Sequence, residues 1–129
     1  MELKVKGKAR EIEFNKIGFI RELDEQYKAE RSGVKFGFGL MFANMYLEQY
    51  SVPALATILK CALFNEKVTL SDVDKAIEDY AEETGDLEPL FQGVIEGLGN
   101  APIVKATVKK LQEAEQSEMN KEAKLKTIS

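Results

Sequence analysis

The amino-acid sequence predicts a mostly helical α+β fold, in which an N-terminal two-stranded β-hairpin leads into a compact group of five or six helices. Residues 2–14 alternate between apolar and polar around a glycine turn, as strands of a hairpin do. Beyond them, apolar residues recur every three or four positions, as on one face of a helix. Capping residues, glycines and prolines divide this stretch into segments of helix length.

The hairpin is predicted from four apolar residues that flank a Lys6-Gly7 turn: Leu3, Val5, Ile12 and Phe14. If Val5 pairs with Lys8, then Leu3 lies opposite Arg10, and the four apolar residues fall on one side. Gly7 supplies the positive φ that a two-residue loop favours. Because a two-stranded hairpin is marginally stable alone, we expect its apolar side to pack on the helices.

Three helices are expected next. The first begins at an Asn15 N-cap and ends at Ser32-Gly33, with an inner stripe of Ile17, Ile20, Leu23 and Tyr27. The second covers Leu40–Tyr50. The third begins at a Ser51 cap, carries Pro53 in its first turn and closes at Asn65. Its buried residues are expected to be Leu55, Ile58, Leu59, Ala62 and Leu63.

Capping signals predict the remaining helices. Thr69 and Asp72 have the spacing of a capping box, and Gly85 ends the helix that they begin, whose inner face is Val73, Ala76, Ile77 and Tyr80. Asp86 caps a fifth helix with inner residues Leu87, Leu90, Phe91, Val94, Ile95 and Leu98. Gly99-Asn100 ends it, and Pro102 begins a last helix with Val104, Val108 and Leu111 inside.

Length and composition indicate one ordinary globular domain. We expect residues 1–115 to form it, and residues 116–129 to be a mobile charged tail with too little apolar surface to hold it to a core. The net charge of −4 offers no general attraction for nucleic acid or an anionic membrane. The N-terminus lacks the apolar core of a signal peptide, and no run reaches the ~20 apolar residues of a membrane span. One cysteine excludes an internal disulfide and suits a reducing cytoplasm.

The sequence offers no catalytic, cofactor-binding or metal-binding motif. Histidine is absent, which removes the commonest general base and metal ligand. Cys61 lies on an apolar helix stripe and is interpreted as a small buried hydrophobe. Gly33, Gly37 and Gly39 lack the spacing of a phosphate loop, so Gly37 and Gly39 are interpreted as a turn or a close backbone approach. We therefore expect no enzyme.

Carboxylates cluster between Asp72 and Glu88, where Lys75 is the only cation. Their spacing does not fit a calcium loop. One interpretation is a solvated helix face with two caps. The other is an acidic docking surface for a basic partner, carried by Asp72, Asp79, Glu82 and Glu83.

The segment 36–50 carries two apolar faces where a helix of a small domain needs one. One face is Leu40, Ala43, Tyr46, Leu47 and Tyr50, and the other contains Phe38, Met41, Phe42 and Met45. Either this is the central helix, buried all round, or its second face is exposed for a partner, since flexible Met and flat aromatic side chains suit adaptable contacts. The candidate partner-binding residues are Phe36, Phe38, Met41, Phe42 and Met45. The exposed face and the hairpin edge also favour self-association.

Four segments, in this order and spacing, resemble the tail assembly chaperones of long-tailed phages and prophages of Gram-positive bacteria. They are the opening Met-Glu-Leu-Lys-Val-Lys-Gly-Lys, residues 18–24 (Gly-Phe-Ile-Arg-Glu-Leu-Asp), residues 33–40 (Gly-Val-Lys-Phe-Gly-Phe-Gly-Leu), and the short helix from Pro53-Ala54-Leu55 to Ala62-Leu63-Phe64. The resemblance covers residues 1–115. The Lys6-Gly7 turn departs from the Asn-Gly expected there.

This resemblance implies a non-enzymatic factor of the host bacterial cytoplasm that is absent from the mature virion. Such proteins bind the tape-measure protein, and tail-tube subunits such as the major tail protein, and promote assembly of the tail tube. Many are also made in a longer, frameshifted form. The resemblance carries no catalytic residue to this chain. The competing interpretations are a structural component of the tail and an unrelated protein-interaction module.

Overall fold

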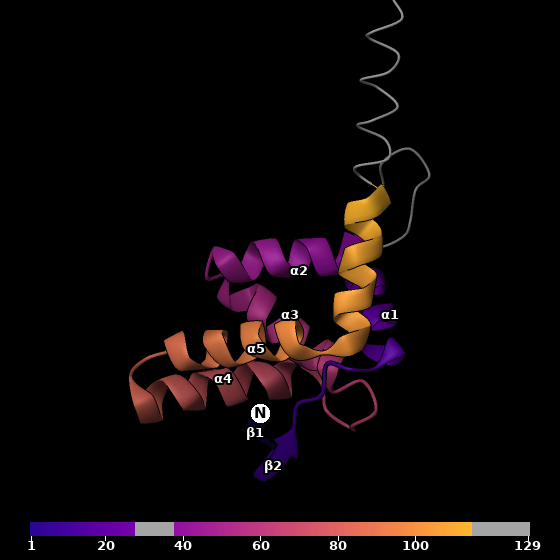
Figure 1. The fold of residues 1–129 in the computed structure, drawn as a ribbon. Helices are drawn as coiled ribbons and strands as arrows, with labels where there is room; N and C mark the ends of the chain where they lie inside the picture. The colour runs from indigo at the N-terminus through magenta and orange to yellow at the C-terminus, as the bar shows by residue number, and fades with distance from the viewer. Residues whose placement is uncertain (28–37, 115–129) are drawn as a thin grey trace, which may run out of the picture.

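The computed structural model describes residues 1–27 and 38–114, except for the side chain of Phe38. Within them an antiparallel hairpin precedes six helices, which confirms the predicted fold class (Figure 1). Some predictions fall outside the described residues: the helix end at Ser32-Gly33, Gly33, Gly37, Phe36 and the tail 116–129.

The hairpin has the predicted register. Strands β1 (Glu2–Val5) and β2 (Lys8–Glu11) pair Val5 with Lys8 and Leu3 with Arg10. Gly7 has φ 74°, and Lys6 joins it in the left-handed region with φ 54°, as both central residues of a type I′ turn must. The predicted apolar side is buried: Leu3, Val5, Ile12 and Phe14.

Helix α1 (Ile17–Gln26) begins without the predicted Asn15 cap. Its N-cap position is Lys16, whose side chain makes no capping bond. The Oδ1 atom of Asn15 instead accepts a hydrogen bond of 2.9 Å from the backbone N–H of Ile103, in the first turn of the last helix. That helix is preceded by Ala101, which has no side-chain oxygen, so Asn15 caps it from far along the chain.

The inner face of α1 is also rotated from the prediction. Ile17 is 63% exposed, whereas Phe19 and Leu23 are fully buried. Of the other predicted inner residues, Ile20 and Tyr27 are half-buried against the core. The helix ends at Gln26, with Tyr27 as its C-cap.

Helix α3 (Val52–Ala62) is the central helix. It contacts α1, α2 (Phe38–Glu48) and α4 (Leu70–Thr84). Most of its residues are buried: Ala54, Leu55, Ala56, Ile58, Leu59, Cys61 and Ala62. The Ser51 cap is confirmed, because its Oγ accepts from the N–H of Ala54 at 3.3 Å. The helix ends at Ala62, so the predicted end at Asn65 was too late.

Helix α2 (Phe38–Glu48) ends before Tyr50, which the sequence had placed on its apolar face. Tyr50 takes φ 55°, and the N–H of Ser51 closes the helix end by donating to the carbonyl of Tyr46 at 3.0 Å. The Tyr50 ring is thereby turned onto Phe91, edge to face, with centroids 5.3 Å apart.

The next helix has the predicted boundaries, whereas the one after it begins at a different cap from the one predicted. At the start of α4 (Leu70–Thr84), Thr69 and Asp72 form both bonds of a capping box, and Gly85 ends it with φ 72°. The N-cap of α5 (Glu88–Asn100) is Leu87, which makes no side-chain capping bond, so the predicted Asp86 cap is wrong by one residue. The Oδ1 atom of Asp86 accepts from the N–H of Glu88, the first residue of the helix, at 2.9 Å. The predicted inner residues of both helices are buried or half-buried.

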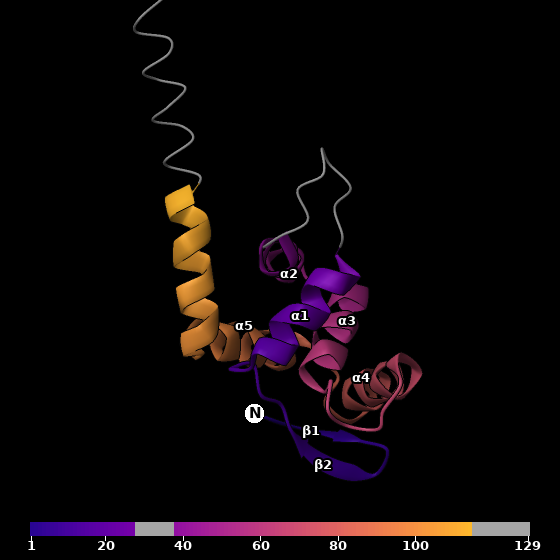
Figure 2. The ribbon, with the colours of Figure 1, turned by 90° about the vertical axis from the view of Figure 1, so that its right-hand side faces the viewer.

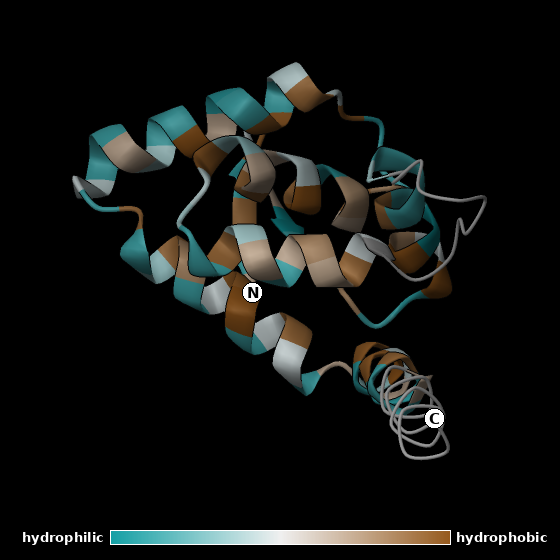
Figure 3. Ribbon diagram, turned by 90° about the horizontal axis from the view of Figure 1, so that it is seen from above, coloured by the Kyte–Doolittle hydropathy of each residue, from teal (hydrophilic) through white to brown (hydrophobic). Residues whose placement is uncertain are grey.

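The last helix, described over residues 102–114, turns away from α5 after Ala101 and rises on one side of α2 (Figure 2). Val104 is buried, whereas Val108 and Leu111 are only half-buried. Figure 3 looks down this helix, with its hydrophobic side turned toward the rest of the molecule. Its predicted inner stripe is therefore only partly covered.

The backbones of α1 and α2 approach each other closely at Gly39. A Cβ atom there would lie 2.7 Å from the backbone carbon of Leu23, and the N–H of Gly39 donates to Asp24 Oδ1 at 3.1 Å. The interpretation of Gly39 as a close backbone approach is therefore confirmed.

We predict that Gly39→Ala lowers the free energy of unfolding by about 1–3 kcal/mol, because the backbone of α1 cannot move aside as a flexible side chain would. The matched control is Gly99→Ala, where a Cβ meets nothing within 4 Å and stability should be unchanged or slightly higher. Chemical denaturation measures both. Equal effects of the two substitutions would contradict the close packing of α1 on α2.

Candidate functional site

The second apolar face of α2 is exposed at two methionines. Met41 is 42% and Met45 is 40% exposed, while Leu40, Ala43 and Leu47 on the opposite face are almost fully buried. The interpretation of α2 as a helix buried all round is therefore wrong, because α3 occupies the centre of the core. The alternative, in which the second apolar face of α2 is exposed, agrees with the exposure of Met41 and Met45.

The predicted partner-binding residues do not all share this exposed face. Phe42 is half-buried and belongs to a ring cluster with Tyr27 and Tyr46, at centroid distances of 6.2 Å from each. Tyr27 follows the end of α1, so Phe42 is directed toward α1. Met41 and Met45 are the predicted residues that the structure brings together.

Met41 and Met45 form one wall of a groove between α2 and the last helix. The opposite wall is formed by Val108, Leu111 and Gln112, and the hollow between them measures about 300 Å³. A second hollow of about 370 Å³ continues toward the end of α5, and it shares three residues with the first: Asn44, Val108 and Gln112. Together the two hollows make one groove.

The spacing of apolar residues in the sequence does not predict the second half of the groove. Its apolar lining is Ile95, Leu98, Val104 and Val108. These residues had been assigned to helix faces in the core, and their spacing gave no sign that one side of the last helix stays open. Two lysines of the last helix, Lys105 and Lys109, lie on its rim.

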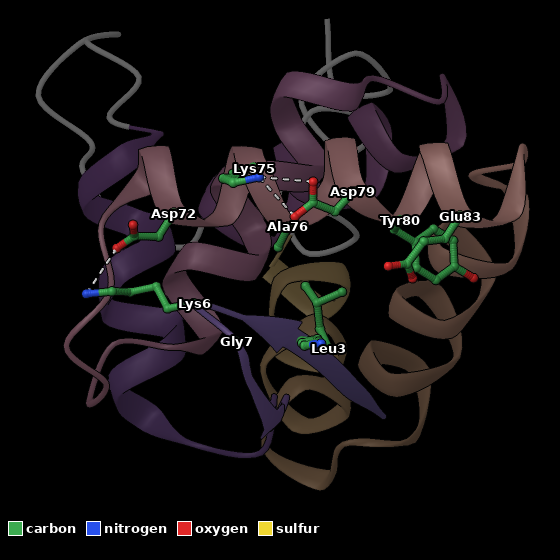
Figure 4. A pocket seen from close by; sticks show the side chains of 10 residues that line it. Leu3, Lys6, Gly7, Asp72, Lys75, Ala76, Asp79, Tyr80 and Glu83 are labelled. Atoms are coloured by element: carbon green, nitrogen blue, oxygen red, sulfur yellow. Dashed lines mark hydrogen bonds and ion pairs between the residues drawn. The ribbon is translucent and has the colours of Figure 1, made fainter.

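Two carboxylates of the acidic face on α4 lie close to lysines, which offset part of their negative charge. Asp72 Oδ2 accepts from the N–H of Thr69 at 2.8 Å, and this backbone bond lowers the pKa of the Asp72 carboxyl. Lys6 of the hairpin turn lies 4.0 Å from the same oxygen, and Asp79 pairs with Lys75 at 3.1 Å (Figure 4).

The hollow beside this face, about 330 Å³, is lined by both signs of charge: Lys4, Lys6 and Lys75, with Asp72, Asp79 and Glu83. Glu83 and its neighbour Glu82 are exposed. The hairpin lysines come from the other end of the sequence, so a count of local charges missed them. Of the two surfaces predicted for docking, the acidic face therefore carries both signs of charge, and the methionine face is the apolar one.

Cys61 is a buried core residue, as predicted. Its side chain is 2% exposed, and burial, helped by the charge of Glu22, raises the pKa of the thiol to about 12. Among residues 1–27 and 38–114, no cluster of three or more metal-ligating side chains is present. In the same part of the chain, no helix has both the length and the apolar character to cross a membrane.

The fold and the groove define a small helical protein with an apolar surface open between two of its helices. The sequence matches the family described as phage tail assembly chaperone protein, TAC, over residues 2–113. The chain belongs to this family of phage tail assembly chaperones. A comparison with curated proteins gave no match, and neither did a comparison with solved structures.

We predict that Cys61 reacts very slowly with iodoacetamide in the folded protein. With a pKa near 12, the thiolate fraction at pH 8 is about a thousandfold below that of an unfolded cysteine. Mass spectrometry should show labelling only after guanidinium is added. Comparable labelling rates in the folded and unfolded protein would contradict the burial of this thiol.

Proposed function

We propose that this tail assembly chaperone binds the tape-measure protein and delivers it for tail-tube assembly, with major tail protein subunits as second partners. Family membership supports the assembly role. The observation that carries the proposal is the exposure of Met41 and Met45 along an apolar groove that no other described part of the chain fills.

The groove has the chemistry that such a client requires. A helical, aggregation-prone client offers apolar side chains along one face, and grooves between helices accept such faces. Methionine is unbranched and polarisable, so Met41 and Met45 can adapt to different client side chains. We further propose that residues 1–115 are the binding domain and that the protein works without catalysis in the host bacterial cytoplasm.

We also propose that the protein is absent from the mature virion. Mass spectrometry of purified particles tests this directly. Stoichiometric amounts of the chain in particles would favour a structural component of the tail instead.

We predict that Met41→Glu together with Met45→Glu abolishes pull-down of co-expressed tape-measure protein, because both carboxylates stand in the apolar groove. The melting temperature should stay close to that of the unchanged protein, since substitutions at exposed sites usually change stability by about 0.5 kcal/mol or less.

The matched control is Ile17→Glu with Leu70→Glu, which replaces two apolar residues that are 63% and 45% exposed and lie outside the groove. This variant should retain the tape-measure protein. If the Met41→Glu, Met45→Glu variant is folded and still binds the tape-measure protein, the groove is not the client site.

Self-association is a further expected property, because the methionine face and the hairpin edges are surfaces that a second copy can cover. Sedimentation velocity over a wide concentration range should show dimers or larger rings at high concentration. A single monomeric species at every concentration would show that these surfaces stay uncovered.

A further inference from the structure

The groove is apolar along its floor but positively charged at one end. Lys105 and Lys109 are one helical turn apart and line the half nearest the end of α5. Neither forms an ion pair with any other residue in the described part of the chain. Across from them, α2 contributes the neutral Asn44.

The other half of the groove has the opposite sign. Its one charged lining residue is Glu48, at the end of α2. The positive charge is therefore confined to the α5 end, where two unpaired ammonium groups stand beside apolar residues. An occupant gains most there if a carboxylate on its flank meets them while its apolar side chains enter the groove.

The length of the groove limits what fits. The lining residues of the last helix run from Val104 to Gln112, roughly 12 Å at 1.5 Å per residue. This corresponds to two or three turns of a partner helix, with apolar residues at about i, i+3 or i+4, and i+7.

We propose that the groove binds one amphipathic helix of the client, whose apolar stripe enters between α2 and the last helix and whose flanking carboxylates lie over Lys105 and Lys109. The inference rests on the proposed client-binding function, and it specifies which client segment is recognised. The apolar stripe supplies the attraction, and the acidic flank selects the segment among other amphipathic helices.

The experiment uses synthetic helical peptides of about 18 residues that share one leucine stripe and carry glutamate, glutamine or lysine on its flank. Fluorescence anisotropy at low salt measures the affinity of each peptide. For the unchanged protein, the affinity should fall from the glutamate to the glutamine to the lysine peptide, with roughly a tenfold difference between first and last from two exposed ion pairs. The spread should shrink at high salt, where exposed charges are screened.

In the double variant Lys105→Glu with Lys109→Glu, the order of the peptide affinities should reverse. In the double variant Lys105→Gln with Lys109→Gln, which introduces no new charge, the three peptides should bind with equal affinity. The matched control is Lys8→Glu with Lys67→Glu, which has the same net charge as the first variant but changes exposed lysines outside the groove, so the original order should remain.

Two outcomes overturn the inference: no preference for the glutamate peptide, or a preference that survives both groove variants. Pull-down of the tape-measure protein separates this failure from that of the proposed function. If the unchanged protein retains the tape-measure protein without any charge preference among the peptides, the acidic-flank inference fails alone. If the peptide order holds and the tape-measure protein is not retained, the identity of the client fails alone.

Discussion

The burial of α3 determines how the other helices are arranged. Its apolar residues are surrounded by α1, α2 and α4, so a helix of only 11 residues supplies much of the core. Each surrounding helix then needs to present only one face inward. For α2 that face is complete with Leu40, Ala43 and Leu47. The exposed methionines are therefore a consequence of the packing around α3, since the core has no room for a second face of α2.

The position of α2 is fixed at both ends, which makes its groove wall a defined surface. At one end Gly39 lets its backbone approach α1 closely. At the other end Tyr50 adopts a left-handed conformation that costs a side-chain-bearing residue about 1–2 kcal/mol. Contact with the Phe91 ring and a hydrogen bond of 3.1 Å to Glu88 offset this cost. Both partners lie on α5, so this end of α2 is held against α5.

Local rules predicted the features that depend on neighbouring residues: the hairpin register, the Ser51 cap, the Thr69-Asp72 capping box and the Gly85 helix end. The errors arose where a distant contact decides. Asn15 caps a helix that begins far along the chain, and Tyr50 leaves its helix to meet Phe91. The methionine wall of the groove was predicted as one of two alternatives. The wall on the last helix could not be predicted. An apolar stripe such as Val104, Val108 and Leu111 has the same spacing whether other helices cover it or leave it exposed.

The construction of the groove is also consistent with the client binding proposed above, since a chaperone must release its client. Filling it requires no core residue to move, because Met41 and Met45 are already exposed and the buried side of α2 is complete. Two shallow hollows of about 300 and 370 Å³ bury only a few client side chains. Fixing flexible methionine side chains on binding also costs conformational entropy. A shallow, adaptable groove therefore favours short-lived contacts with the proposed client, and the proposed role of the charged end in selecting it requires no deep burial.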